Sequence, residues 1–253
     1  MKRLVFSEIE KNGYSIEVAK NMYMRYDYID TIWKRILKSP VGERKYLYSD
    51  IGMYFMAKLV EEITGMTIDK YLDKEFYTPM KLSRICYKPL RKYSVEEIVP
   101  TEEDQYFRNQ LLIGYVHDPG AAMLGGIGGH AGLFGDSYSL GAIFQMLLNG
   151  GEYGGRRYLK WSTIEKFTSY QYKDNNNRRG LGFDKPAFFT GKNSNVAQGV
   201  SSRSFGHSGF TGTYVWADPE SNIVYVFLCN RVYPVAENNK IIEMNIRTEI
   251  QSI

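Results

Sequence analysis

Residues 205–228 read FGHSGFTGTYVWADPESNIVYVFL. Two runs rich in β-branched and aromatic residues, 213–217 and 223–229, flank the polar segment 218–222. This segment contains Asp218-Pro219 and Asn222, which are residue types that favour a turn. The stretch therefore predicts two antiparallel strands joined as a hairpin, late in the chain.

The residues before this hairpin have mainly helical patterns. Apolar spacing predicts helices, together with capping residues such as Asp136 before residue 137 and terminating glycine or proline residues such as Gly65. The expected ranges are 15–24, 27–38, 51–64, 68–76, 137–148, one starting at a Ser162/Glu165 capping box, and 237–250. The segment 83–115 has a mixed pattern. Helices followed by strands indicate an α+β fold, in one domain over residues 1–253 with a mostly helical lobe (1–200) and a sheet with a final helix (201–253).

The composition is that of an ordinary globular protein, with 253 residues, 43% hydrophobic and 24% charged. The net charge of +4 is small, and the Lys and Arg residues are scattered among acidic ones. This argues against nucleic acid binding. Apolar runs are too short to predict a membrane span. The two cysteines and three histidines lack the spacing of a disulfide framework or a metal site, so we expect no cofactor and no metal.

The tripeptide His207-Ser208-Gly209 precedes Phe210 at the start of the expected sheet. Small residues at a strand edge let a ligand approach the backbone, which is how some serine acyl-transfer enzymes build half of an oxyanion hole. The simpler interpretation is an ordinary strand start with a glycine bulge.

A second candidate motif is Tyr48-Ser49-Asp50, at the entrance of the helix expected from residue 51. A tyrosine there could shuttle a proton, and Asp50 could hydrogen-bond a substrate amide. Alternatively, Tyr48 packs against the protein, and Ser49 or Asp50 is simply a helix cap.

The glycine-dense segment 124–135 contains the loose pattern G-x-G-x-x-A at residues 126–131. A dinucleotide site would need a strand before this pattern and a second strand with an acidic residue after the helix. Neither is indicated, so we expect a turn-rich loop packed beneath a cleft.

Together, the two motifs resemble the serine β-lactamase-like hydrolases, which include class C β-lactamases, penicillin-binding D,D-peptidases and esterases. In that family Ser-x-x-Lys, Tyr-x-Asn and a Lys-Thr-Gly-type strand, which also occurs as His-x-Gly, meet in one cleft. Tyr48-Ser49-Asp50 and His207-Ser208-Gly209 match the last two elements in the family's order, whereas no Ser-x-x-Lys occurs in the 253 residues.

The resemblance implies a β-lactamase/transpeptidase-like fold that is N-terminally incomplete. It assigns Tyr48 the role of proton shuttle, Phe210 N–H the role of oxyanion donor, and Ser208 and Thr211 contacts with substrate. Gly209 would allow close approach at the strand. Asp50 replaces the usual Asn, and His207 replaces Lys, so classical β-lactamase activity is not expected.

If His207 faces substrate, its charge should titrate at about pH 6 to 7.

The segments 114–118 and 230–234 are similar to the hydrolase module behind a family 3 glycoside hydrolase domain of bacterial surface proteins. This implies the C-terminal portion of a longer, extracytoplasmic protein acting on a small or peptidoglycan-related substrate. The alternatives are a noncatalytic module that binds cell-wall peptide or sugar, and a structural appendage of a fused glycosidase.

Overall fold

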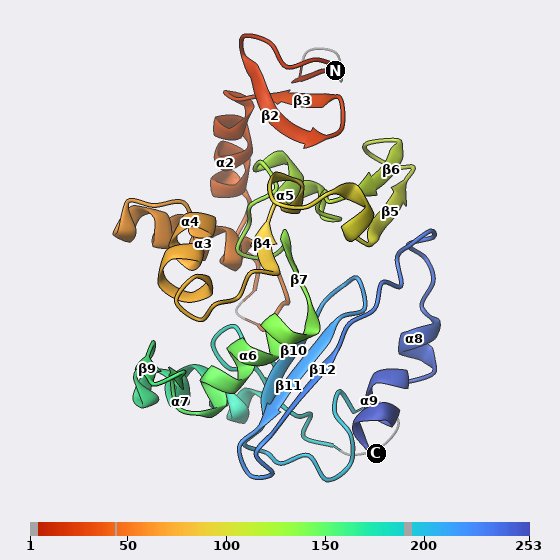
Figure 1. Cartoon of the computed structure of the whole chain (residues 1–253). Helices are drawn as coiled ribbons and strands as arrows, with labels where there is room; N and C mark the ends of the chain where they lie inside the picture. Colours follow the sequence, from red (N-terminus) through yellow and green to blue (C-terminus); the bar gives the residue numbers. More distant parts are fainter. Residues whose placement is uncertain (1–4, 44, 190–193) are drawn as a thin grey trace. The chain divides into compact units, whose positions relative to one another are not determined.

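The computed structural model describes residues 5–43, 45–189 and 194–253 (Figure 1). The chain divides into two compact units. The first comprises Met1–Lys74 and Cys86–Phe134, and the second comprises Glu75–Ile85 and Gly135–Ile253. The strands β4 (Ile85–Tyr87) and β7 (Leu133–Gly135), which pair with each other, lie where the chain passes from one unit to the other.

The first unit begins with a three-stranded sheet of order β1-β3-β2, formed by β1 (Phe6–Ser7), β2 (Tyr14–Ala19) and β3 (Met22–Arg25). The helix expected over residues 15–24 is therefore wrong. Asn21 adopts φ 54° in the tight connection between β2 and β3, a conformation that hairpin turns require. Val18 and Met24 are buried in a core with Ala121.

Helices make up much of the rest of the first unit. They are α2 (Tyr28–Lys38), α3 (Ile51–Thr64), α4 (Ile68–Leu72) and α5 (Pro119–Met123). The expected helices over residues 27–38 and 51–64 are confirmed, and Gly65 ends α3 with φ 68°. The helix expected over 68–76 is α4 followed by a π-helix, Asp73–Tyr77.

The mixed segment 83–115 contains short strands and two 3₁₀ turns. Besides β4 it forms an antiparallel pair of β5 (Pro100–Asp104) and β6 (Gln110–Ile113), and 3₁₀ turns at Pro89–Arg91 and Val95–Glu97. The β5–β6 pair holds a buried charged cluster described below.

The second unit is built on the antiparallel sheet β10 (Phe205–Ser208), β11 (Tyr214–Asp218) and β12 (Ile223–Phe227). The predicted hairpin is thus confirmed as β11 and β12. The helix α6 (Ser137–Leu148) lies along this sheet (Figure 1), and Asp136 caps it by accepting a hydrogen bond from Ser139 N, as expected.

The two faces of the sheet carry different partners. Phe205 pairs with Ala217 across the strands and stacks on Phe144 of α6, with ring centroids 6.2 Å apart. On the other face, Tyr214 stacks on Trp216 and its hydroxyl reaches the Gln251 side chain at 3.2 Å. Since opposite residues in an antiparallel pair share a face, His207 and Val215 lie on the α6 face.

The remaining elements of the second unit are β8 (Glu152–Tyr153), β9 (Arg156–Arg157), α7 (Trp161–Thr168), a 3₁₀ turn (Lys173–Asn175), α8 (Lys240–Glu243) and α9 (Ile246–Gln251). Two expectations are wrong here. Helix α7 begins at Trp161, so Ser162 lies inside its first turn and forms no capping box. The single helix expected over 237–250 is interrupted at Asn245, which adopts φ 54°.

Candidate active site

Tyr48, Ser49 and Asp50 lie directly before α3, and all three residues are exposed. Ser49 Oγ accepts a weak hydrogen bond from Ile51 N at 3.3 Å. Asp50 occupies the N-cap position in a helical conformation, and its side chain makes no capping hydrogen bond. The Tyr48 side chain is 59% exposed, so it is not buried in the core.

The glycine-rich segment 124–135 packs against the first turn of α3. The His130 ring stacks on Tyr54 with centroids 4.2 Å apart and planes within 12°. A side chain at Gly129 would meet Met53 O at 2.3 Å, so only glycine allows this approach. The segment thus packs against a helix and has no strand–loop–helix geometry for a nucleotide, in agreement with the expected turn-rich loop.

Asp118 anchors the same segment. Its Oδ1 lies 2.9 Å from His130 Nε2 and accepts a hydrogen bond from Ala121 N at 2.7 Å, which caps α5. Burial alone would raise the pKa of the Asp118 carboxyl, but these hydrogen bonds outweigh it and lower the pKa. Burial, with smaller contributions from the Asp118 and Asp50 carboxylates, raises the pKa of Tyr54 to about 12.

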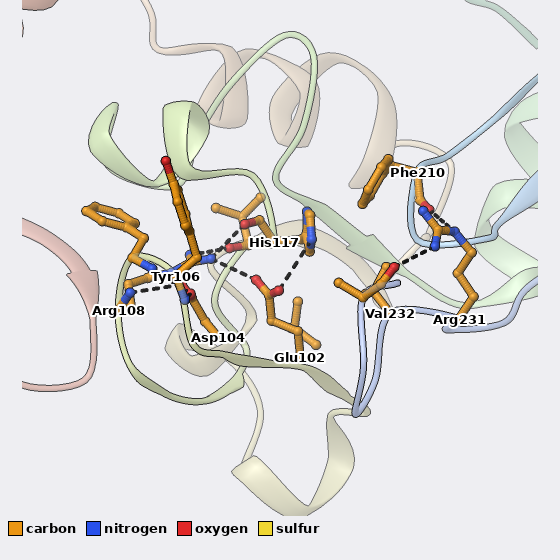
Figure 2. A network of polar contacts seen from close by, with 12 residues as sticks. Glu102, Asp104, Tyr106, Arg108, His117, Phe210, Arg231 and Val232 are labelled. Carbon is orange, nitrogen blue, oxygen red and sulfur yellow. Dashed lines mark hydrogen bonds and ion pairs between the residues drawn. The ribbon is translucent and has the colours of Figure 1, made fainter. Parts of the chain in front are cut away.

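A second buried cluster lies at β5 and β6 (Figure 2). The fully buried Arg108 side chain pairs with Asp104 at 2.6 Å and Glu102 at 2.9 Å, and donates to the carbonyls of Val116 and His117 at 2.6 Å each. Such a network costs desolvation and is kept together by its complete set of partners. It fixes the backbone immediately before Asp118.

The tripeptide at β10 runs into a tight turn. Gly209 N donates to Thr213 O at 2.8 Å, Gly212 N donates to Gly209 O at 3.0 Å, and Gly212 adopts φ 108°. The Phe210 side chain is 64% exposed on this turn. Ser208 is exposed and Thr211 is half-buried, so the backbone and side chains of residues 208–211 lie at the surface of the second unit.

Arg231 contacts this turn through its backbone and its side chain (Figure 2). Its Nε donates to Phe210 O at 2.8 Å, its backbone N donates to Thr211 O at 2.8 Å, and its guanidinium lies 4.4 Å from the centre of the Phe210 ring. Its Nη1 also donates to Ala236 O and Asn238 O. Arg231 therefore ties the turn to the segment before α8.

The site residues proposed from the sequence divide between the two units. Tyr48 and Asp50 belong to the first unit, and the adjacent residues His207–Thr211 belong to the second. Sequence reasoning missed the supporting residues Asp118, Arg108 and Arg231. Asp118 followed by Pro119 is a local signal for a helix start that could have marked Asp118 as an N-cap. No spacing pattern marks Arg108 or Arg231, because their partners include backbone carbonyls that only the fold brings close.

Within residues 5–43, 45–189 and 194–253, no group of three or more His, Cys, Asp or Glu side chains could hold a metal ion. Over the same ranges, no helix has the length and apolar character needed to cross a membrane.

Comparison with known proteins identifies the family. Residues 12–244 match the Beta-lactamase family model, and the chain therefore belongs to the β-lactamase family. A "Putative D-alanyl-D-alanine carboxypeptidase" of Salmonella enteritidis PT4 is 30% identical over 226 residues, which cover 83% of this chain and 52% of that protein. The chain thus spans about half the length of the curated relatives it matches.

Solved structures support the same fold. Simvastatin synthase from Aspergillus terreus matches with a TM-score of 0.55 at 16% identity, over 89% of this chain and 60% of that one. The octameric penicillin-binding protein homologue from Pyrococcus abyssi matches with a TM-score of 0.51 at 17% identity, over 85% and 46%. These likenesses confirm the α+β, β-lactamase/transpeptidase-like fold expected from the two motifs.

Proposed function

We propose that this chain contributes the tyrosine and His-x-Gly elements to the active site of a serine acyl hydrolase of the D-alanyl-D-alanine carboxypeptidase type. Its substrates would be peptidoglycan-related peptides or simple esters. One observation carries the proposal: a chain 30% identical over 226 residues to a protein of that description contains both motifs in the order typical of the family.

In this proposal the nucleophile is a serine outside the 253 residues, since they contain no Ser-x-x-Lys. Its hydroxyl would attack the carbonyl carbon of the substrate, and Tyr48 would help to move the proton to the leaving group. The backbone N–H of Phe210 would donate to the oxyanion, which is a large source of transition-state stabilisation in such enzymes. The surface position of residues 208–211 supports this role.

A noncatalytic binding module is the second candidate function, and the missing Ser-x-x-Lys favours it. The same surface turn could hold a cell-wall peptide without cleaving it. Fusion to a family 3 glycoside hydrolase domain and an extracytoplasmic location remain predictions from the resemblance.

The test starts from the genomic DNA upstream of the Met1 codon, read in frame. If a Ser-x-x-Lys lies there, the longer product should hydrolyse p-nitrophenyl acetate and diacetyl-L-Lys-D-Ala-D-Ala. A serine-to-alanine variant and the 253-residue chain should both be silent, because losing a serine nucleophile costs about a millionfold in turnover.

Two results would overturn the proposal in different ways. Saturable turnover by the 253-residue chain, unaffected by a chelator, would show that another residue attacks the substrate. Binding of the peptide without turnover by the chain, with no Ser-x-x-Lys found upstream, would establish the binding module instead.

A further inference from the structure

Both ring nitrogens of His207 have defined partners. Nδ1 lies 2.8 Å from the Ser208 carbonyl oxygen, and Nε2 lies 3.0 Å from Nη1 of Arg179. A carbonyl oxygen can only accept a hydrogen bond, and a guanidinium can only donate. Both contacts are satisfied only when Nδ1 carries the proton and Nε2 is the acceptor, which makes His207 neutral.

The charged groups beside His207 do not favour protonation of its ring to the cation. Arg178 makes two hydrogen bonds to the Asp184 carboxylate, at 2.8 and 3.0 Å, so that carboxylate already has a cationic partner. Asn195 also donates to Asp184, at 3.2 Å. The charged groups Arg178, Arg179 and Asp184 together carry a net charge of about +1.

A proton on Nε2 would also point at the Arg179 N–H group. Burial lowers the pKa of His207, and although the Ser208 carbonyl and Asp184 act in the opposite direction, the pKa stays below its ordinary value with the help of Arg179 and Arg178. This differs from the sequence-based expectation that His207 titrates at its reference pKa.

We propose that Arg179 is a positioning residue that holds His207 as the neutral tautomer protonated on Nδ1. The His207 side chain then keeps one hydrogen-bonding pattern at neutral and mildly acidic pH, and the positive charge at this end of the site belongs to arginine. His207 therefore replaces the family's lysine in position but not in charge. This last consequence rests on the proposed function, whereas the tautomer does not.

The tautomer can be measured in the 253-residue chain itself. Long-range ¹H–¹⁵N correlation spectra of the ¹⁵N-labelled protein distinguish a protonated from an unprotonated ring nitrogen, and His207→Gln assigns the signal among the three histidines. We expect a protonated Nδ1 and an unprotonated Nε2 from about pH 8 down to below the ordinary pKa of about 6.5. A wild-type ring that is protonated on Nε2, or that titrates at or above that value, would overturn the proposal.

Variants separate positioning from general stability. Arg179→Met removes the donor, and His207 should then gain the Nε2–H form and titrate nearer its ordinary pKa. Arg179→Lys retains a cationic donor and should restore the wild-type tautomer at least in part. Arg156→Met, which removes an exposed arginine of β9 in the same unit, should leave the His207 spectrum unchanged. An unchanged spectrum in Arg179→Met would contradict the proposal, and if that variant does not fold, the wild-type titration decides.

A binding measurement tests the functional consequence. Diacetyl-L-Lys-D-Ala-D-Ala and its C-terminal amide differ by one negative charge, and their affinities for the chain are compared at pH 6 and pH 8. We expect the affinity of the carboxylate peptide divided by that of the amide to change less than twofold between pH 8 and pH 6. If this ratio is about tenfold higher at pH 6, His207 becomes a cation there. Failure of both peptides to bind would count against the proposed substrate class, while the tautomer would still be decided by the spectra.

Discussion

Arg231 is the residue that most directly determines the shape of the turn carrying the proposed oxyanion donor. It binds Phe210 O, Ala236 O and Asn238 O through its guanidinium, and 8% of its surface is exposed. Removing the guanidinium would leave these carbonyls without that donor. The cost of an unsatisfied buried polar group is about 1 to 3 kcal/mol.

We therefore expect Arg231→Met to lower the free energy of unfolding by about 1 to 3 kcal/mol. It should also speed amide hydrogen exchange at Gly209 and Gly212, whose N–H groups make the hydrogen bonds of the turn, beyond what the global loss explains. Urea denaturation and site-resolved exchange measure the two effects. The control Arg156→Met removes an exposed arginine and should change neither. Unaltered exchange at Gly209 and Gly212 would show that the turn keeps its shape without Arg231.

Asp118 gives a pH-dependent prediction. Its pKa is lowered in the folded protein, so its contribution to stability is present above the unfolded pKa of about 3.9 and is lost as the pH falls through the folded pKa. Asp118→Asn should cost about 1 kcal/mol at pH 7, and the difference from wild type should shrink by pH 3. Urea denaturation at both pH values measures it, and a pH-independent difference would contradict this origin.

At the scale of elements, the glycine-rich segment acts on α3 by close packing. Gly129→Ala would place a Cβ 2.3 Å from the backbone oxygen of Met53, so the helix must move. We expect a loss of about 1 to 3 kcal/mol, the usual cost of overpacking. Gly52→Ala is the matched control in the first turn of α3. An added Cβ there meets nothing within 4 Å, so this substitution should not destabilise the protein. Equal effects of the two substitutions in chemical denaturation would refute the packing argument.

Capping and terminating residues correctly predicted where helices begin and end. Gly65 and Asp136 correctly mark the end of α3 and the start of α6, because a helix terminus depends on the backbone conformation and capping of one residue. The helix prediction for residues 15–24 was wrong because a segment of ten residues can form either a helix or a hairpin. The hairpin is stabilised by packing of Val18 and Met24 against α5, which is a contact between residues distant in sequence.

The same distinction applies to the candidate site. Tyr48 and the His207–Phe210 stretch form short continuous motifs, so the sequence alone could single them out. Arg179, by contrast, meets His207 28 positions further along the chain, and the neutral tautomer depends on that contact. No spacing rule connects a loop arginine with a strand histidine, so the charge state of the site could not be predicted.

For the complete chain, the feature to test is the apolar face of α3 in the first unit, because its side chains are partly exposed. Ile51, Phe55, Leu59 and Ile63 recur every four residues and are 41%, 38%, 48% and 75% exposed, and no residue of α3 is buried. Contiguous exposed apolar surface usually leads to association. The 253-residue chain studied alone should therefore self-associate, through this face, as its concentration rises.

Static light scattering across a concentration series measures this association. The double variant Leu59→Lys/Ile63→Lys should reduce the mean mass toward that of the 29.2 kDa monomer, since two charges on the apolar face oppose its burial. The control Glu61→Gln/Glu62→Gln adds the same net charge of about +2 to the helix without changing its apolar face, and should still associate. A wild-type chain that is monodisperse and monomeric, with one cooperative thermal transition, would show that this face needs no cover and would favour the self-sufficient binding module over the hydrolase.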